Sequence, residues 1–238
     1  WGAGRRGDPL KILAQGLWLS LAAWPFTLLL GWGALQLFPL FGHDSKQVVE
    51  ETIFCRVMLL GSIFPLLRAA LSGYFTGIGS TRTVMVANAV ALVVNVVLNY
   101  ALIFGHWGFP RLETAGSALA TVAGAAAMVV VLAIACIRDC RRGEVVVVPR
   151  WYRFDRQILA RLFKFGTPCG VEFFLNLLAF NLVVMMMHGY GKVVATAVTI
   201  VFSWDLVSFI PMMGIQTGVM TLVGHNLGAG LPEAAERS

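Results

Sequence analysis

The chain contains six long, continuously apolar stretches, and this feature limits its fold more than any other. A transmembrane helix needs about 20 mostly apolar residues to cross a hydrocarbon core of roughly 30 Å. The stretches do not alternate with period two, as membrane β-strands do. They are residues 12–41, 53–77, 83–105, 116–137, 165–188 and 193–223. The sequence therefore predicts an all-α, polytopic membrane protein with six transmembrane helices.

The composition supports this fold class and excludes several others. Hydrophobic residues make up 58% of the 238 residues and charged residues only 13%, with a mean hydropathy of +0.78. A soluble domain carries about 25% charged residues. An ordinary cytosolic enzyme, a disordered chain and a secreted disulfide scaffold are therefore excluded.

The basic residues predict the orientation of the spans. Thirteen of the 18 Lys and Arg residues lie in one set of connections, three lie in the opposite set, and Arg56 and Arg68 lie inside spans. By the positive-inside rule, the first set is cytoplasmic. The formal charge of +6 thus indicates contact with a lipid bilayer and not with nucleic acid.

The longest connection, residues 138–164, is the one predicted internal boundary. We expect a partial amino-terminal lobe of four transmembrane helices over residues 1–140. A basic cytoplasmic linker over 141–164 follows, in which Asp155 caps a short amphipathic helix lying on the membrane surface. Residues 165–238 begin a carboxy-terminal lobe with two transmembrane helices. Because the sequence starts at Trp1 and its last residues look like the start of another helix, we interpret it as an internal fragment.

Two carboxyl groups interrupt the last two spans, and an ionisable group inside a span is a candidate functional residue. Glu172 lies roughly 12 Å along its helix from Lys164, and Asp205 lies roughly 20 Å along the next helix from Lys192. The two groups thus reach similar depth, where a carboxyl group can exchange a proton or a sodium ion. Asn176 is one turn beyond Glu172. The alternative is that both carboxyls are satisfied hydrogen-bonding groups in a wet cavity wall, or that Glu172 reaches back to the surface.

The span over 83–105 carries a stripe of amides. Asn88, Asn95 and Asn99 lie within about 40° of one another on a helix. Such a stripe must face protein or water, because lipid offers no hydrogen-bond partner. Hydrogen bonding between helices and a cation or proton relay are equally compatible with the spacing.

Other residues receive structural roles. Pro25, Pro65 and Pro211 each remove a backbone hydrogen bond within a span, so we expect kinks or hinges there. The four cysteines are expected to be small buried side chains, with palmitoylation of Cys136 and Cys140 as the alternative. No catalytic or metal-binding motif is recognised, so we predict neither an enzyme nor a metal site.

Three linked motifs resemble the multidrug and toxic compound extrusion (MATE) family. They are Ser72–Arg82, Val94–Gly105 and Ala115–Thr121, and the similarity continues through Phe165–Pro168, Phe209–Gly214 and Val223–Gly230. The resemblance implies a transporter with twelve spans in two lobes around a central cleft, of which this chain is similar to spans three to eight.

The resemblance also implies site residues. Asn95, Asn99 and Thr121 match the positions of a proton- or cation-sensitive site, with Asn99 in place of an Asp. Asn176 matches a cation-binding carboxylate of the seventh span. In this chain the carboxylate, Glu172, lies one turn earlier, and Asp205 follows on the next span.

The function implied is an ion-coupled antiporter that exports organic, cationic or amphipathic compounds from the cytoplasm. Proton or sodium would be the coupling ion, with no other cofactor. The protein would be a monomer in the plasma membrane, which is the inner membrane in a bacterium. The alternatives are a flippase for lipid-linked sugars of similar architecture and an intramembrane enzyme that uses Glu172 and Asp205 as an acid pair.

Overall fold

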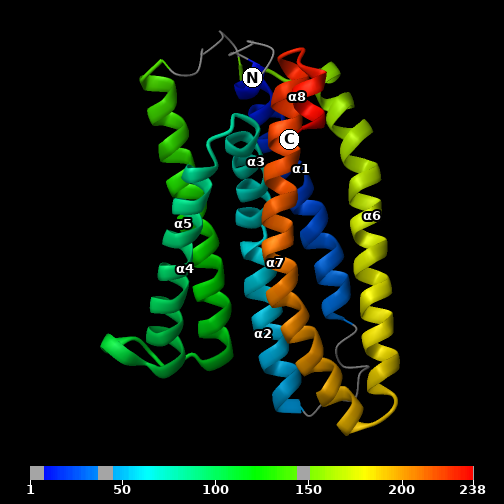
Figure 1. The fold of residues 1–238 in the computed structure, drawn as a ribbon. Helices are drawn as coiled ribbons and strands as arrows, with labels where there is room; N and C mark the ends of the chain where they lie inside the picture. The colour runs from blue at the N-terminus through cyan, green and yellow to red at the C-terminus, as the bar shows by residue number, and fades with distance from the viewer. Residues whose placement is uncertain (1–7, 37–44, 144–150, 238) are drawn as a thin grey trace. The chain divides into compact units, whose positions relative to one another are not determined.

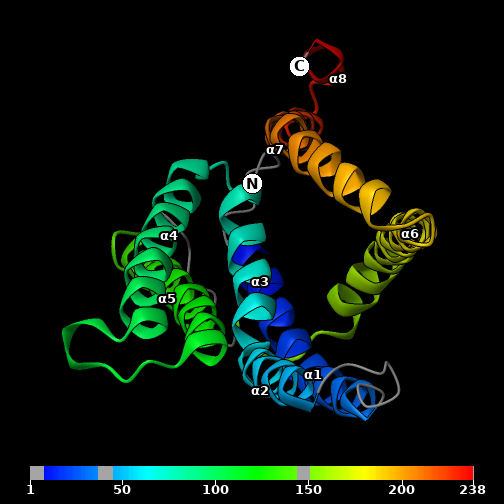
Figure 2. The same cartoon turned by 90° about the horizontal axis from the view of Figure 1, so that it is seen from below.

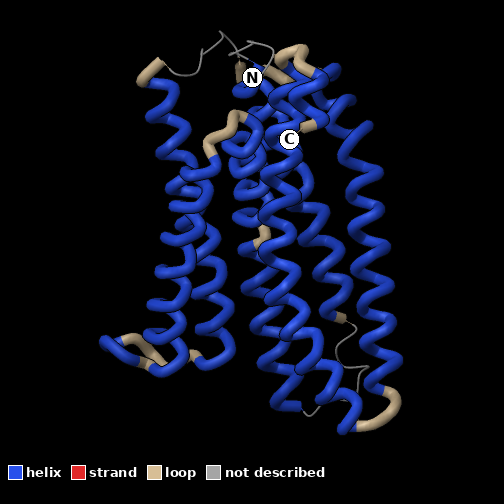
Figure 3. The backbone as a smooth tube through the Cα atoms, in the orientation of Figure 1, coloured by secondary structure: helices blue, strands red, loops and turns tan. Residues whose placement is uncertain are grey.

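The computed structural model describes residues 8–36, 45–143 and 151–237, and every regular element within these ranges is helical (Figure 3). Figure 1 shows the order of the elements along the chain. They are α1 (Asp8–Leu35), α2 (Ser45–Gly61), α3 (Ile63–Gly77), α4 (Thr81–Phe104), the 3-10 turn η2 (His106–Gly108), α5 (Glu113–Arg141), α6 (Arg156–His188), α7 (Lys192–Gly228) and α8 (Pro232–Glu236).

The lengths and hydropathies of these helices confirm the predicted fold class. Among the described residues, α1, α4, α5, α6 and α7 are each long and apolar enough to cross a membrane. The pair formed by α2 and α3 passes the same test together and counts as a sixth, broken span. The described residues therefore hold the six spans expected from the sequence when the bent pair of α2 and α3 is counted as one span.

The span predicted over residues 53–77 bends between α2 and α3, close to Pro65, one of the three positions where a kink or hinge is expected. The two helices are bent by 41° at Ser62. Pro65, in the first turn of α3, has no N–H to donate to the Gly61 carbonyl, and its ring crowds that carbonyl. At the break, the Leu59 carbonyl accepts hydrogen bonds from the Ser62 hydroxyl at 2.7 Å and from the Ser62 backbone N–H at 3.2 Å.

The chain divides into two compact units, one up to Arg153 and one from Phe154 onward. The core of the first unit is built from α1, α3, α4 and α5. Its buried side chains are Leu10, Leu13, Leu71, Tyr74, Phe75, Ala87, Met128 and Leu132. Figures 1 and 2 both show α4 and α5 side by side, and these two helices form the most extensive pairing in the unit.

Glycine geometry sets the end of α4. Gly105 adopts the left-handed conformation with φ of 72°, which a residue with a side chain rarely accepts. The chain then turns through η2, which connects α4 to α5.

The second unit begins at a capped helix terminus. The Asp155 carboxylate accepts hydrogen bonds from the backbone N–H groups of Gln157 at 2.9 Å and Ile158 at 3.3 Å. This cap was expected from the sequence. The separate amphipathic helix was not correct, because residues 156–164 are the first turns of α6 and the helix continues through Pro168. A helix that enters lipid keeps its remaining backbone hydrogen bonds, because breaking it there would expose further unpaired groups.

The predicted linker at 141–164 therefore holds the end of α5, residues 144–150 outside the described ranges, and the start of α6.

Further along, a ring contact joins α6 to α7. Phe180 and Phe202 meet edge to face at 4.7 Å between centroids, close to the loop that connects the two helices. The helix expected after the last span is observed as α8, which Pro232 begins.

Candidate functional site

The first candidate site is the amide pair on α4. Asn99 Nδ2 donates a hydrogen bond to Asn95 Oδ1 at 3.1 Å, and both residues are half-buried. Asn99 Oδ1 is buried and, within the described residues, has no hydrogen-bond partner. An unpaired buried acceptor costs about 1–3 kcal/mol, so such an atom in a native structure calls for a water, an ion or a functional explanation.

Small residues on α5 bring that helix against the pair. A Cβ atom on Gly124 would lie 3.0 Å from the Ala91 carbonyl oxygen and 3.1 Å from Asn95 Cβ. A Cβ on Gly116 would lie 2.8 Å from the Leu102 carbonyl oxygen. The helices approach this closely because neither glycine has a side chain, which is the role of small residues between transmembrane helices.

Thr121 and Asn88 are both exposed, and among the described residues no hydrogen bond joins either of them to the pair. The Thr121 hydroxyl donates to the Ser117 carbonyl of its own helix at 2.9 Å, and Thr121 is three residues before Gly124, which touches Asn95. Asn88 is exposed and donates to the Val84 carbonyl at 3.0 Å. Of the three amides in the expected stripe, only Asn95 and Asn99 are therefore half-buried. In the turn that contains Asn88, the buried residue of α4 is the neighbouring Ala87.

The second candidate site holds the two carboxyl groups of the second unit. Glu172 is the middle residue of α6, and Asp205 lies in the first half of α7. Both side chains are exposed, and within the described part of the chain neither carboxylate forms a hydrogen bond or ion pair. Measured along the helices from the connecting loop, Glu172 lies roughly 25 Å and Asp205 roughly 21 Å away, a similar depth.

Asn176 belongs to the same helix face as Glu172. Its Nδ2 donates to the Glu172 backbone carbonyl at 3.0 Å, so its amide is held by α6 itself. Asn176 precedes Phe180 by one turn, and Phe180 contacts α7. The structure therefore places Asn176 near the face of α6 that points toward α7, with an amide oxygen available as an acceptor.

The three predicted hinge prolines have different surroundings. Pro25 and Pro211 lie inside α1 and α7, which both continue past them. Pro65 lies in the first turn of α3, next to the 41° break at Ser62. A hinge at each of these positions stays a prediction.

Two side chains of α1 that no sequence motif singled out, Gln15 and Trp18, bind the backbone of residues 152 and 153. Buried Gln15 donates from Nε2 to the Arg153 carbonyl at 2.8 Å, and Trp18 Nε1 donates to the Tyr152 carbonyl at 3.0 Å. Gln15 is a polar side chain inside an apolar stretch, and this signal was present in the sequence. In the described ranges, no group of three His, Cys, Asp or Glu side chains could hold a metal ion.

Comparison with known sequences identifies relatives along nearly the whole chain. The MatE family model matches residues 1–101 and 168–238. The multidrug resistance protein PmpM of Pseudomonas aeruginosa is 27% identical over 235 residues, which cover 98% of this chain and 49% of that protein. A probable multidrug resistance protein NorM of Chromobacterium violaceum is 30% identical over 234 residues, covering 93% and 48%. The chain spans about half the length of the curated relatives it matches.

Solved structures show the same fold. A MATE transporter in complex with MaD5 superposes with a TM-score of 0.72 at 18% identity, covering 99% of this chain and 56% of that one. An outward-facing multidrug resistance MATE transporter gives a TM-score of 0.70 at 18% identity, covering 99% and 55%.

These comparisons confirm the resemblance seen in the motifs. The chain is a multi-pass protein of the plasma membrane, and its relatives are transporters, so the alternative of an intramembrane enzyme is wrong. The chain belongs to the MatE family.

Proposed function

We propose that the protein to which this chain belongs exports organic compounds from the cytoplasm and is driven by the entry of protons or sodium ions. Cationic or amphipathic compounds are the substrates we expect. The names of the relatives, multidrug resistance proteins, support export of drug-like compounds. The lipid bilayer is its environment, no cofactor besides the coupling ion is required, and the working form is a monomer.

The observation that supports ion coupling is the pair of carboxyls, Glu172 and Asp205, which lie in two consecutive apolar helices and have no hydrogen-bond or ion-pair partner among the described residues. A charged Asp at the centre of a membrane helix costs about 2.5–3.5 kcal/mol on insertion scales. Binding a proton or a sodium ion removes that net charge. Each carboxyl therefore has a reason to bind the ion in one state of the transporter and to release it in another.

An ion drives transport only if it binds the two states with different affinity. In our proposal, the carboxyls meet water on one side of the membrane in one state and on the other side in the second. Pro211 lies six residues after Asp205 and supplies a position where α7 can bend between the states. The Asn95–Asn99 pair of the first unit, with its buried unpaired oxygen, is a second place where ion binding can act.

The test uses the full-length protein in sealed proteoliposomes loaded with a fluorescent organic cation. An inwardly directed proton gradient and an inwardly directed sodium gradient are imposed in separate experiments. We expect one of the two gradients to drive substrate against its own gradient, and an ionophore for that ion to stop it. Substrate movement that neither gradient accelerates would contradict ion coupling, while export by itself would remain measurable.

A further inference from the structure

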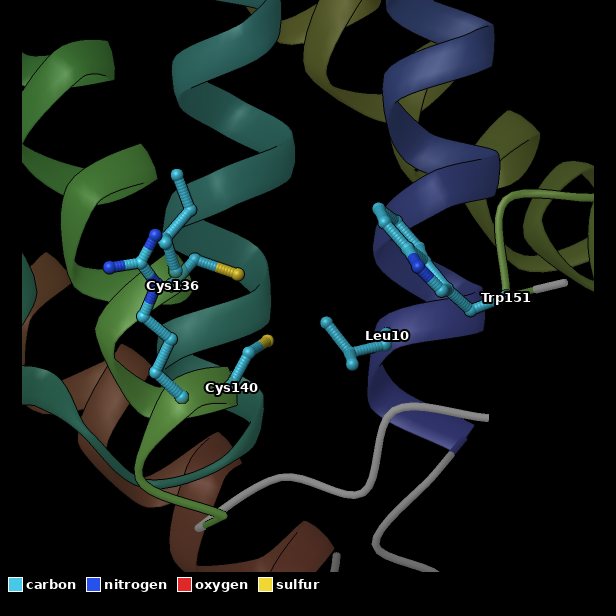
Figure 4. A pocket seen from close by; sticks show the side chains of 6 residues that line it. Leu10, Cys136, Cys140 and Trp151 are labelled. Atoms are coloured by element: carbon cyan, nitrogen blue, oxygen red, sulfur yellow. The ribbon is translucent and has the colours of Figure 1, made fainter. Parts of the chain in front are cut away.

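A cavity opens at the end of the first unit where α5 finishes. It has a volume of about 380 Å³ and is lined by Leu10 of α1, by Trp151, and by Cys136, Ile137, Cys140 and Arg141 of α5. Figure 4 shows the sulfur atoms of Cys136 and Cys140 both turned toward the gap that Leu10 and Trp151 face. Its size lies within the usual range of small-molecule pockets, about 300–1,000 Å³.

The Cys136 and Cys140 thiols cannot form a disulfide with each other. Both cysteines are free, and they lie one turn apart on α5. Residues at this spacing have Cβ atoms about 5–6 Å apart, whereas a disulfide needs about 3.5–4.5 Å. The intact helix therefore prevents a disulfide, although the sulfurs are close enough to interact with each other. A single atom that is bonded to both sulfurs can bridge the two side chains without unwinding the helix.

A third polar group adjoins the pair. Tyr74 of α3 is only 6% exposed, and its hydroxyl has no hydrogen-bond partner of normal geometry within the described residues. The Cys136 thiol is its neighbour. The buried Tyr74 hydroxyl lies beside the Cys136 thiol, so this end of the core keeps a polar position that a bound group can use.

We propose that Cys136 and Cys140 form a dithiol site for trivalent organoarsenicals, whose apolar substituent occupies the cavity. Thiol sulfur is a soft ligand and prefers soft, thiophilic centres. In the reaction, two As–S bonds form and two As–O bonds break. The two thiol protons leave with the two hydroxyl groups as water, and arsenic stays trivalent, so no oxidant or reductant is needed.

The walls of the cavity select the substituent. Leu10, Ile137 and Trp151 present mainly apolar surface, and an aromatic ring on the arsenic can pack against the Trp151 indole. An arsenical without such a group gains only the two As–S bonds. The site goes beyond the proposed export function, which does not depend on it.

The experiment titrates purified full-length protein with phenylarsine oxide and maps the adduct by peptide mass spectrometry. We expect one phenylarsenic group bridging Cys136 and Cys140, and both thiols protected from maleimide until a free dithiol is added. Cys136→Ser and Cys140→Ser should each weaken binding on the order of 10²- to 10⁴-fold, because the second bond is no longer intramolecular. Cys55→Ser and Cys169→Ser are matched controls and should bind like the unchanged protein.

A second comparison tests the cavity. Trp151→Ala should weaken binding of the phenyl compound about tenfold and leave binding of arsenite unchanged. Thermal unfolding of each variant shows whether it remains folded. Retention of tight binding by either single serine variant, separate adducts on separate cysteines, or a palmitoyl group already on either thiol would overturn the proposal.

Discussion

The side-chain N–H of Asn99 donates to the side-chain oxygen of Asn95 one turn earlier, at 3.1 Å, and the Asn99 oxygen is buried with no partner in the described part of the chain. The family resemblance implies an Asp at the position of Asn99. An Asn keeps the hydrogen bond to Asn95 and cannot ionise. In our proposal, the first unit keeps the polar position of an ion-coupling site without its charge.

Replacement of Asn99 by leucine separates stability from function at this position. Leucine has the same branching and number of side-chain heavy atoms as asparagine, and Asn99→Leu removes the buried oxygen. That removal offsets the loss of a hydrogen bond that in membrane proteins is worth about 0.6 kcal/mol. We expect a melting temperature equal to or above that of the unchanged protein, and reduced gradient-driven efflux. A variant that transports at the full rate would show that the amide pair only joins helices.

Because α4 and α5 approach closely, one methyl group added between them should lower the stability of the protein strongly. Gly116→Ala places Cβ about 2.8 Å from the Leu102 carbonyl oxygen, so the two backbones must separate. We expect a loss of about 1–3 kcal/mol, seen as a lower melting temperature in detergent. The control is Gly73→Ala in α3, where nothing lies within 4 Å and the better helix propensity of alanine should be neutral or stabilising. Equal effects of both variants would contradict this packing.

The hydrogen bond from Gln15 to the Arg153 carbonyl predicts how strongly the backbone at Arg153 is held against α1. Gln15→Leu keeps a side chain in this buried position but removes the donor to the Arg153 carbonyl. The loss of about 1 kcal/mol should make trypsin cleavage after Arg153 about fivefold faster. Trp18→Phe, which removes the exposed donor to Tyr152, should have a smaller effect. An unchanged cleavage rate in Gln15→Leu would show that other contacts hold this segment.

The cap at the start of α6 can be tested by hydrogen exchange. Asp155→Ala removes the acceptor of two backbone N–H groups and should cost about 1 kcal/mol, so the first turn of α6 should exchange faster. Asp155→Asn keeps the acceptor oxygen and should exchange nearly like the unchanged protein. If both variants exchange alike, the carboxylate does not stabilise the helix end through these bonds.

Local chemistry made part of this structure predictable. The apolar stretches predicted the spans, Asp155 predicted a helix start, and the run at the end of the sequence predicted α8, because each signal depends on neighbouring residues only. The break at Ser62 required a choice between a kink and a complete interruption. Pro65 permits both, and the packing of α2 against α5 and of α3 against α1 decides between them.

The candidate site was predictable to a smaller extent. A charged group in an apolar stretch identifies Glu172 and Asp205 whatever the tertiary structure. The partner of Gln15 lies 138 residues away, and the meeting of Gly124 with Asn95 depends on how α4 and α5 cross. Such contacts between distant parts of the chain leave no pattern at a fixed spacing in the sequence.

The central claim is that an ion acts through a carboxyl group of the second unit, and Asp205 tests it most directly. Asp205→Asn keeps the size of the side chain, so the loss of charge is the main change. Glu172→Gln is the companion variant, and it should lose as much transport as Asp205→Asn if the two groups share the ion, and less if Glu172 reaches the surface. Binding of substrate should persist in both, because drug sites are lined mainly by apolar side chains.

The measurement is efflux from proteoliposomes containing full-length Asp205→Asn, with the ion gradient that drives the unchanged protein. Substrate binding to the same preparation, followed by fluorescence, confirms that the variant is folded. The account predicts that binding is retained and gradient-driven efflux is abolished. Gradient-driven efflux at the full rate would contradict it and leave Asp205 as a polar residue without a part in transport.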